Sequence, residues 1–194
     1  MPLKAKERDA SQERARLMEI IRERSYAFGV SVTLASGRKS NTYFNMKPTM
    51  LHPEGAFLSA ALLLDEISKL DADYVGGLEL GAVPITAAVT ARSFALGHPL
   101  PALIMRKKAK DHGTQQRLEG LTAEESLRGK RVVVVEDVTT SGGSALQAVE
   151  AVRDMGGTVE HVVTVLDRNE GATETLKDHG ITLISLFKQS DFTG

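Results

Sequence analysis

The fold of this chain is decided by one stretch, Val132-Val133-Val134-Val135-Glu136-Asp137-Val138-Thr139-Thr140-Ser141-Gly142-Gly143-Ser144. Four consecutive valines are typical of a strand buried on both faces, as in a parallel sheet covered by helices. We expect that strand to end where the two carboxylates follow, and the Thr, Ser and Gly residues to form a loop that opens a helix. This order predicts acidic groups and backbone N–H donors at the carboxyl edge of a sheet, where open α/β folds bind ligands.

Strands and helices are expected to alternate on both sides of this stretch. The expected strands are Tyr74–Leu78, Ala102–Arg106, Arg131–Glu136, Val159–Leu166 and Thr182–Phe187. The expected helices are Glu54–Leu70, Pro84–Leu96, Ser144–Met155 and Ala172–His179. Such alternation predicts an α/β fold with a central, mostly parallel sheet flanked by helices.

The first 50 residues follow a different pattern. Apolar residues at helical spacing predict a helix from Ser11 to Phe28, which Gly29 would end. Two short strand-like runs, Val30–Leu34 and Thr42–Phe44, then enclose a polar and basic turn, which predicts a hairpin. We therefore expect residues 1–50 to form a helix and a small hood beside a core of residues 51–194, within one structural unit.

Composition narrows the class of protein. A length of 194 residues suits a single domain, and a net charge of −1 argues against a general nucleic-acid binder. No apolar run approaches the roughly 20 residues that span a bilayer, and no targeting segment is visible in the first 24 residues. The absence of cysteine excludes disulfide and thiolate chemistry and fits a reducing compartment. We expect a cytoplasmic protein that binds neither nucleic acid nor membranes.

The loop after the acidic strand has the features of a phosphate site. Unpaired N–H groups at the start of the following helix favour an anion, and glycines allow the backbone to approach it closely. Glu136 and Asp137 suit ribose hydroxyls, or a Mg²⁺ held through water. The alternative is an ordinary strand–turn–helix junction, in which Ser and Gly cap the helix. The segment has neither the Gly-Lys-Ser/Thr of a triphosphate-binding loop nor G-x-G-x-x-G.

The whole segment resembles the phosphoribosyl-pyrophosphate (PRPP) signature of type I phosphoribosyltransferases. In that family the acidic pair contacts the ribose 2′ and 3′ hydroxyls, and the loop binds the 5′-phosphate. The resemblance therefore assigns the ribose to Glu136 and Asp137, and PRPP carries Mg²⁺, which Asp137 reaches through water. It assigns the phosphate contacts to Val138, Thr139, Thr140, Ser141, Gly142, Gly143 and Ser144.

A basic segment follows the strand that is expected to end at Arg106. Between Arg106 and Arg117 the chain has five basic residues and one acid, a local charge of +4. Such a loop attracts anions and can stabilise the charge that develops on a departing pyrophosphate. The alternative is a solvated loop that is rich in lysine because loops tolerate charge.

This basic segment is similar to the mobile catalytic loop of orotate phosphoribosyltransferases. The resemblance implies PRPP contacts at Arg106, Lys107, Lys110 and His112, with Lys110 and His112 as the catalytic residues. It also implies a homodimer in which the loop, residues 107–120, reaches the neighbouring active site. The remaining four histidines are expected at the surface or in turns.

Two further segments resemble the parts of that family that bind the base. Ser36–Asn45 resembles the hood segment that lies over orotate, which implies contacts from Tyr43 and Phe44; a Tyr-Phe pair in a strand is otherwise commonly a core element. Asp167-Arg168-Asn169-Glu170-Gly171 matches the family segment whose Arg binds the orotate carboxylate. Thr140 matches a loop Thr that contacts orotate. Ala35 and Gly81 stand where some members have lysines that contact PRPP.

The resemblance implies transfer of a phosphoribosyl group from PRPP to orotate, giving orotidine 5′-monophosphate and pyrophosphate, a Mg²⁺-dependent step of UMP biosynthesis. Two alternatives stay open at this point. One is a phosphoribosyltransferase for another base. The other is a regulator that binds PRPP or nucleotides without catalysis, although the Lys110–His112 loop and Arg168 argue against it.

Overall fold

The central element of the structure is a six-stranded sheet. A computed structural model of the chain describes residues 9–33, 39–107 and 117–193, with backbone alone at 30–33 and 39–40. The strands are β3 (Tyr74–Leu78), β4 (Ala102–Met105), β5 (Leu118–Glu119), β6 (Val132–Thr139), β7 (His161–Asp167) and β8 (Thr182–Lys188), in the order β5-β4-β3-β6-β7-β8. All neighbouring strands run parallel except β5, which is antiparallel to β4. The predicted α/β fold is confirmed.

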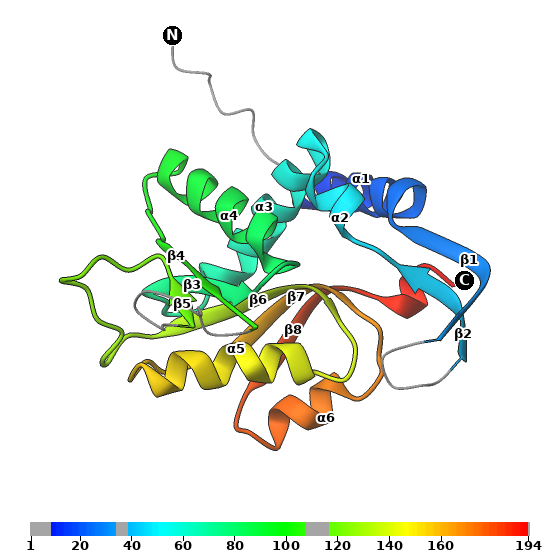
Figure 1. Cartoon of the computed structure of the whole chain (residues 1–194). Coiled ribbons are helices and arrows are strands. Elements are labelled where there is room, and N and C mark those ends of the chain that lie inside the picture. Colours follow the sequence, from blue (N-terminus) through cyan, green and yellow to red (C-terminus); the bar gives the residue numbers. More distant parts are fainter. Residues whose placement is uncertain (1–8, 34–38, 108–116, 194) are drawn as a thin grey trace, which may run out of the picture.

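Helices cover both faces of this sheet (Figure 1). The helices α3 (Pro53–Ile67) and α4 (Ala82–Ala95) lie on one side, together with α1 (Ala10–Arg24) and the short α2 (Lys47–Met50). The helices α5 (Gly143–Asp154) and α6 (Ala172–Lys177) lie on the other. The sheet therefore separates two hydrophobic cores.

The four valines of β6 divide between these two cores. Val133 and Val135 pack with α1 and α3 in the first core, and Val132 and Val134 pack with α5 in the second. All four are buried. Since burying a valine contributes roughly 1.5–3 kcal/mol, β6 is held from both sides, and the prediction of a doubly buried strand is confirmed.

Several predicted boundaries are wrong, and two of them have a clear structural cause. The first helix ends at Arg24, and residues 26–28 belong to β1 (Tyr26–Thr33), because Tyr26 and Phe28 pair with Phe44 and Thr42 across a hairpin. Strand β6 does not end at Glu136 but continues to Thr139, because β7 keeps pairing with it as far as Asp167. In both cases a partner strand extends the ladder beyond the local pattern.

Three short elements were not expected from the sequence. They are α2, the two-residue strand β5, and a 3₁₀ turn at Gln189–Asp191. Each has few residues, so no periodic pattern could reveal it. The strand β5 is paired with β4 through Ile104 and Met105.

The hood hairpin, β1 with β2 (Lys39–Phe44), is a separate two-stranded sheet that shares a core with the rest of the chain. Phe44 and Met46 are buried in the first core beside α1 and α3. The Phe44 ring lies 4.9 Å from that of Tyr26 and 5.4 Å from that of Phe192 near the C-terminus. The hood is therefore fixed relative to the sheet by apolar packing.

Candidate active site

The carboxyl edge of the sheet contains a cavity of about 280 Å³ beside β6. Strand β6 contributes Glu136 and Asp137, and the turn between β3 and α4 contributes Glu79, Leu80 and Gly81. The remaining lining residues are Lys47, Leu78, Lys107, Val138 and Ser144. The structure thus brings the predicted acidic pair, the first residue of the basic loop and the start of α5 to one place.

Glu136 is buried, with 5% of its surface exposed, and its Oε1 atom has no hydrogen-bond partner among the described residues. Burial and the neighbouring Asp137 raise the pKa of Glu136 to about 8, although the charge of Lys107 acts in the opposite direction. A buried oxygen without a partner is costly. Glu136 is therefore ready to accept a hydrogen bond from a ligand.

Asp137 is less buried than Glu136, and its carboxylate accepts a hydrogen bond. Burial raises its pKa above the usual range, while the Val138 N–H and the charges of Lys47 and Lys107 favour the ionised form. The Val138 N–H donates to Asp137 Oδ1 at 2.9 Å. The two adjacent carboxylates therefore differ in environment, and neither has a partner among the described residues that would make it a proton-transfer residue.

The N-terminus of α5 adjoins this cavity. Gly142, the residue before the helix, has a φ of +86°, a left-handed conformation that favours glycine, and no side chain caps the helix there within the described chain. A smaller cavity of about 20 Å³ lies at this point, lined by Glu136, Val138, Thr139, Thr140, Gly142, Ser144 and Ala145. Ser141 and Gly143 are exposed. The loop therefore presents free backbone N–H groups and hydroxyls beside the acidic pair.

The basic segment begins and ends next to the same cavity. The Arg106 N–H donates to the Arg117 carbonyl at 2.7 Å, and the Arg106 guanidinium lies 3.4 Å from Glu119 Oε1. The Lys107 N–H donates to Glu79 Oε1 at 2.9 Å, which places Lys107 at the cavity. The predicted catalytic residues, Lys110 and His112, lie outside the described residues.

Arg168 lies at the carboxyl end of β7, on the side of the sheet edge that faces the hood. It is 5% exposed, and its Nη2 lies 3.0 Å from Glu170 Oε1. Its Nε donates to Gln189 Oε1 at 3.1 Å, and Nη2 also donates to the Thr42 carbonyl at 3.4 Å. The hood strand β2 therefore lies against this guanidinium.

The predicted base-binding residues divide into two groups. Tyr43 follows Thr42 in β2 and is 42% exposed, while Thr140 is half-buried in the loop after β6. The Arg168 N–H donates to the Thr139 carbonyl at 2.9 Å, which brings Arg168 next to that loop. Phe44, by contrast, is only 6% exposed, and its ring packs into the first core. Its side chain does not face the same region as that of Tyr43.

Gly81 occupies a position where no side chain fits as the structure stands. A Cβ atom added there would lie 2.4 Å from Asp137 Oδ1. With Asp137 in this position, a lysine at residue 81 would collide with the Asp137 carboxylate. Ala35, the second departure from the family pattern, lies outside the described residues.

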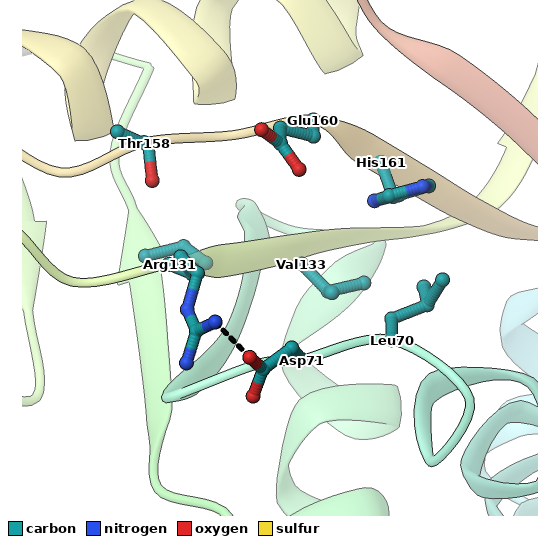
Figure 2. A pocket seen from close by; sticks show the side chains of 8 residues that line it. Leu70, Asp71, Arg131, Val133, Thr158, Glu160 and His161 are labelled. Atoms are coloured by element: carbon teal, nitrogen blue, oxygen red, sulfur yellow. Dashed lines mark hydrogen bonds and ion pairs between the residues drawn. The ribbon is translucent and has the colours of Figure 1, made fainter.

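A third cavity, of about 80 Å³, lies at the opposite edge of the sheet, where β6 and β7 begin. Figure 2 shows Arg131 paired with Asp71 across it, with Thr158, Glu160 and His161 on the far wall. The Arg131 N–H also donates to Asp73 Oδ2 at 2.8 Å. Arg131 is therefore paired with the two aspartates of the loop before β3, and these pairs join loops at the amino edge of the sheet.

The described residues offer neither a membrane span nor a cluster of metal ligands. No helix among them is long and apolar enough to cross a membrane. No group of three or more His, Asp or Glu side chains within that part of the chain could hold a metal ion. Of the histidines outside the basic loop, His52 caps α3 and accepts from the Gly55 N–H at 3.4 Å, and His98 and His179 are exposed.

Sequence reasoning missed three residues near these groups: Lys47, Glu79 and Gln189. Each comes from a short element or a turn that has no pattern of its own. The one available signal was Pro48, since proline at the first turn favours a helix start and so could have indicated the element that carries Lys47.

Comparison with known proteins now agrees with this geometry. Residues 51–188 match the family model described as phosphoribosyl transferase domain. The chain therefore belongs to the phosphoribosyltransferase class, and the matched residues include the six-stranded sheet, the acidic pair and the loop before α5.

Relatives that align with nearly the whole chain identify one family within this class. The chain is 53% identical to an orotate phosphoribosyltransferase of Rhodopseudomonas palustris (strain BisB18), over 94% of this chain and 97% of the relative. A crystal structure of the Mycobacterium tuberculosis orotate phosphoribosyltransferase with Fe(III) dicitrate is 40% identical, with a TM-score of 0.78 over 92% of this chain and 98% of that one. A structure of the same enzyme with PRPP is 37% identical, with a TM-score of 0.76 over 94% and 99%. The chain belongs to the orotate phosphoribosyltransferase family.

Proposed function

We propose that the protein transfers the phosphoribosyl group of PRPP to N1 of orotate, releasing pyrophosphate and forming orotidine 5′-monophosphate. The observation that carries this proposal is the buried Glu136, whose Oε1 has no hydrogen-bond partner among the described residues, in a cavity that also holds Asp137, Lys107 and the start of α5. Acids alone would repel a phosphorylated ligand. Acids beside a cation and free N–H donors suit a sugar that carries phosphates.

The ribose and its 5′-phosphate take the β6–α5 side. Glu136 and Asp137 accept hydrogen bonds from the 2′ and 3′ hydroxyls, which gives Glu136 the partner it lacks. The N-terminus of α5, with Thr139, Thr140 and Ser144, receives the phosphate, because backbone N–H groups and the helix dipole favour an anion.

The pyrophosphate takes the side of the basic loop. Arg106, Lys107, Lys110 and His112 come from this segment, and their charge compensates the negative charge that grows as the C1′–O bond breaks. The adjacent carboxylate oxygens of Glu136 and Asp137 are hard donors that fit a substrate-bound Mg²⁺, with Asp137 reaching it through water. When bound, Mg²⁺ neutralises pyrophosphate charge.

Orotate is expected between the hood and the end of β7. Arg168 binds its carboxylate, since a guanidinium can do so with two parallel hydrogen bonds. Tyr43 offers an exposed aromatic face to the flat ring, Thr140 contacts its edge, and Phe44 supports β2 from the core. Arg168 must exchange part of its contact with Glu170 or Gln189 to do this.

The chemistry requires positioning more than proton transfer. Orotate N1 is readily deprotonated, so attack on C1′ needs no strong general base. The protein aligns two bound substrates and stabilises charge in a transition state with oxocarbenium character. Both effects lower the activation free energy of the transfer. Both substrates are anions that membranes exclude, which supports a location in the cytoplasm.

We also infer that two copies of the chain form a homodimer. Leu51, Phe57 and Phe94 are large apolar side chains with more than half of their surface exposed, and they come from the α2–α4 side of the molecule. Exposed apolar surface of this kind can mark an interaction surface. We infer that a second copy covers this side, and that the basic loop reaches the partner's site as the resemblance implies.

The proposed reaction is tested by following loss of orotate absorbance with PRPP and Mg²⁺. Activity that needs all three components supports the proposal. Consumption of adenine, hypoxanthine or uracil without consumption of orotate would refute the assignment of the base. Binding of PRPP with no turnover of any base would indicate a regulator.

A further inference from the structure

Lys47 is a charged residue of the active-site cavity to which neither the sequence motifs nor the proposed reaction gives a role. It is the first residue of α2, and its side chain is exposed and lines the 280 Å³ cavity. Within the described chain its ammonium group makes no hydrogen bond or ion pair. A lysine that lines a cavity without a fixed partner can exchange water for an anionic ligand.

The backbone of α2 is held firmly, although the Lys47 side chain makes no hydrogen bond or ion pair with the described part of the chain. Met46 and Met50 on either side of it are buried in the first core. Thr49 is fully buried, and its hydroxyl lies 2.6 Å from that of Ser25. The Lys47 N–H donates to Asn45 Oδ1 at 3.3 Å. The point from which the side chain extends is therefore set by the core.

The charge of Lys47 acts on Asp137, where it favours the ionised form and lowers the pKa, as the charge of Lys107 also does. For Glu136 the only cation with such an effect among the described residues is Lys107. The two lysines thus act on the carboxylates from different positions. A polyanion between them would meet one cation on each side.

The turn between β3 and α4 supplies no cation to this cavity. It contributes Glu79, Leu80 and Gly81, and Asp137 lies where a side chain at residue 81 would begin. The lining residues comprise three acids, Glu79, Glu136 and Asp137, and two bases, Lys47 and Lys107. Because pyrophosphate bears several negative charges, losing either base would make the lining more negative and would weaken its binding.

We propose that Lys47 is a further PRPP-binding residue, whose ammonium group contacts the pyrophosphate oxygens from the hood side. This inference rests on the proposed function and adds to it a contact from outside the recognised motifs. The 5′-phosphate is not its target, because that group belongs to the N-terminus of α5. The contact is charge-assisted, so its loss should weaken pyrophosphate binding by about tenfold or more.

The test is calorimetric binding of two ligands, each with Mg²⁺ in the buffer: pyrophosphate and ribose 5-phosphate. Lys47→Ala should raise the Kd of pyrophosphate at least about tenfold and leave that of ribose 5-phosphate within about twofold. Lys47→Arg should retain most of the affinity for pyrophosphate. The matched control is Lys177→Ala, an exposed lysine on α6 that lies away from the cavity and should change neither Kd.

The outcomes separate this inference from the proposed function. Equal weakening of both ligands would overturn the inference, since it would indicate an effect through Asp137 or a general loss of charge. Unchanged binding of pyrophosphate would overturn it as well. If the wild-type chain converts no orotate, the proposed function fails, whereas a selective loss of pyrophosphate affinity would still support Lys47 as a ligand-binding residue. Unchanged melting temperatures of the variants would verify that they fold.

Discussion

Arg168 is the residue on which specificity for orotate is expected to depend. Its guanidinium is already ordered by Glu170, Gln189 and the Thr42 carbonyl, so little conformational entropy is lost when it binds a carboxylate. Replacing it with alanine should raise the KM for orotate by about 10²-fold or more. The KM for PRPP should change only a few-fold in the same steady-state assays.

Arg168→Lys is the informative companion to that variant. Lysine keeps the charge but cannot make the two parallel hydrogen bonds of a guanidinium, so it should recover only part of the loss. Similar increases in both KM values for Arg168→Ala would contradict a role specific to the orotate carboxylate.

Glu136 should make the ligand-free protein pH-dependent in stability. Its folded-state pKa of about 8 lies above the ordinary value of 4.5, so the folded state binds the proton more tightly than the unfolded state does. Raising the pH from about 4.5 to 8 therefore ionises the unfolded state first and destabilises the fold. Glu136→Gln removes this penalty.

We expect Glu136→Gln to melt at a higher temperature than wild type at pH 8.5, with the difference vanishing near pH 4.5. Scanning calorimetry at several pH values measures this directly. Glu150→Gln, at an exposed position on α5, is the control and should show no such trend. A difference in melting temperature that is the same at every pH would show that burial does not perturb Glu136.

At this scale the sequence predicted the residues that lie within one motif. Glu136, Asp137 and Lys107 all line the cavity, because the first two lie in β6 and Lys107 lies two residues after β4, and the pattern revealed both strands. Lys47 and Glu79 could not be predicted, since their role depends on how α2 and the β3–α4 turn approach β6. The Phe44 ring packs into the core and anchors the hood. A Tyr-Phe pair looks the same in sequence whether its rings pack into a core or bind a ligand, so this position could not be predicted.

The element that begins at Lys107 is expected to control the rate. The backbone hydrogen bond between Arg106 and Arg117 joins the two ends of this segment beside the cavity. The position of both ends is therefore fixed. Lys110→Ala should lower kcat by about 10²–10³-fold, because the lost charge acts on the departing pyrophosphate. The Kd of PRPP should stay within a few-fold.

The control for this variant is Lys108→Ala in the same segment, which should keep kcat within a few-fold. Single-turnover measurements alongside kcat would separate chemistry from product release. An unchanged kcat for Lys110→Ala would remove this lysine from the mechanism.

Helices and long strands were predictable, but boundaries that depend on a partner were not. The core strands and α3 to α6 appear near their expected places because hydrophobic periodicity is a local property. Strand β6 runs three residues past Glu136 because β7 pairs with it. The first helix ends before its predicted boundary because Tyr26 and Phe28 pair with β2. These are tertiary effects that override local preference.

The whole molecule is expected to work as a pair. If each basic segment serves the neighbouring active site, Lys110→Ala and Asp137→Ala subunits are inactive alone but complement each other. A heterodimer then contains one site with both residues intact. Mixing the two variants under conditions of subunit exchange should restore part of the wild-type activity, measured by loss of orotate absorbance.

Exchange itself must be demonstrated, for example with differently tagged subunits. Absence of rescue despite exchange would show that the segment acts in its own subunit. Phe94→Glu places a charge on the exposed apolar side of α4 and should shift the protein towards monomers in sedimentation experiments.

At this largest scale the alternation of strands and helices predicted the layers but not their order. It implied a parallel sheet with both faces covered, and this is what the structure has. The order β5-β4-β3-β6-β7-β8 puts β6 between β3 and β7, which is why the turn after β3 and Arg168 after β7 flank the acidic pair. Strand order depends on crossover connections that leave no mark in local sequence.

The way the hood is anchored also bears on how tightly substrates bind. Thr49, Met46, Met50 and Phe44 fasten one wall of the site into the same core that holds the sheet. A wall that is ordered before the ligand arrives loses little freedom on binding, so more of each contact appears as affinity. Weakening that anchor, as Thr49→Ala would, should therefore cost substrate affinity through entropy even though Thr49 itself is fully buried.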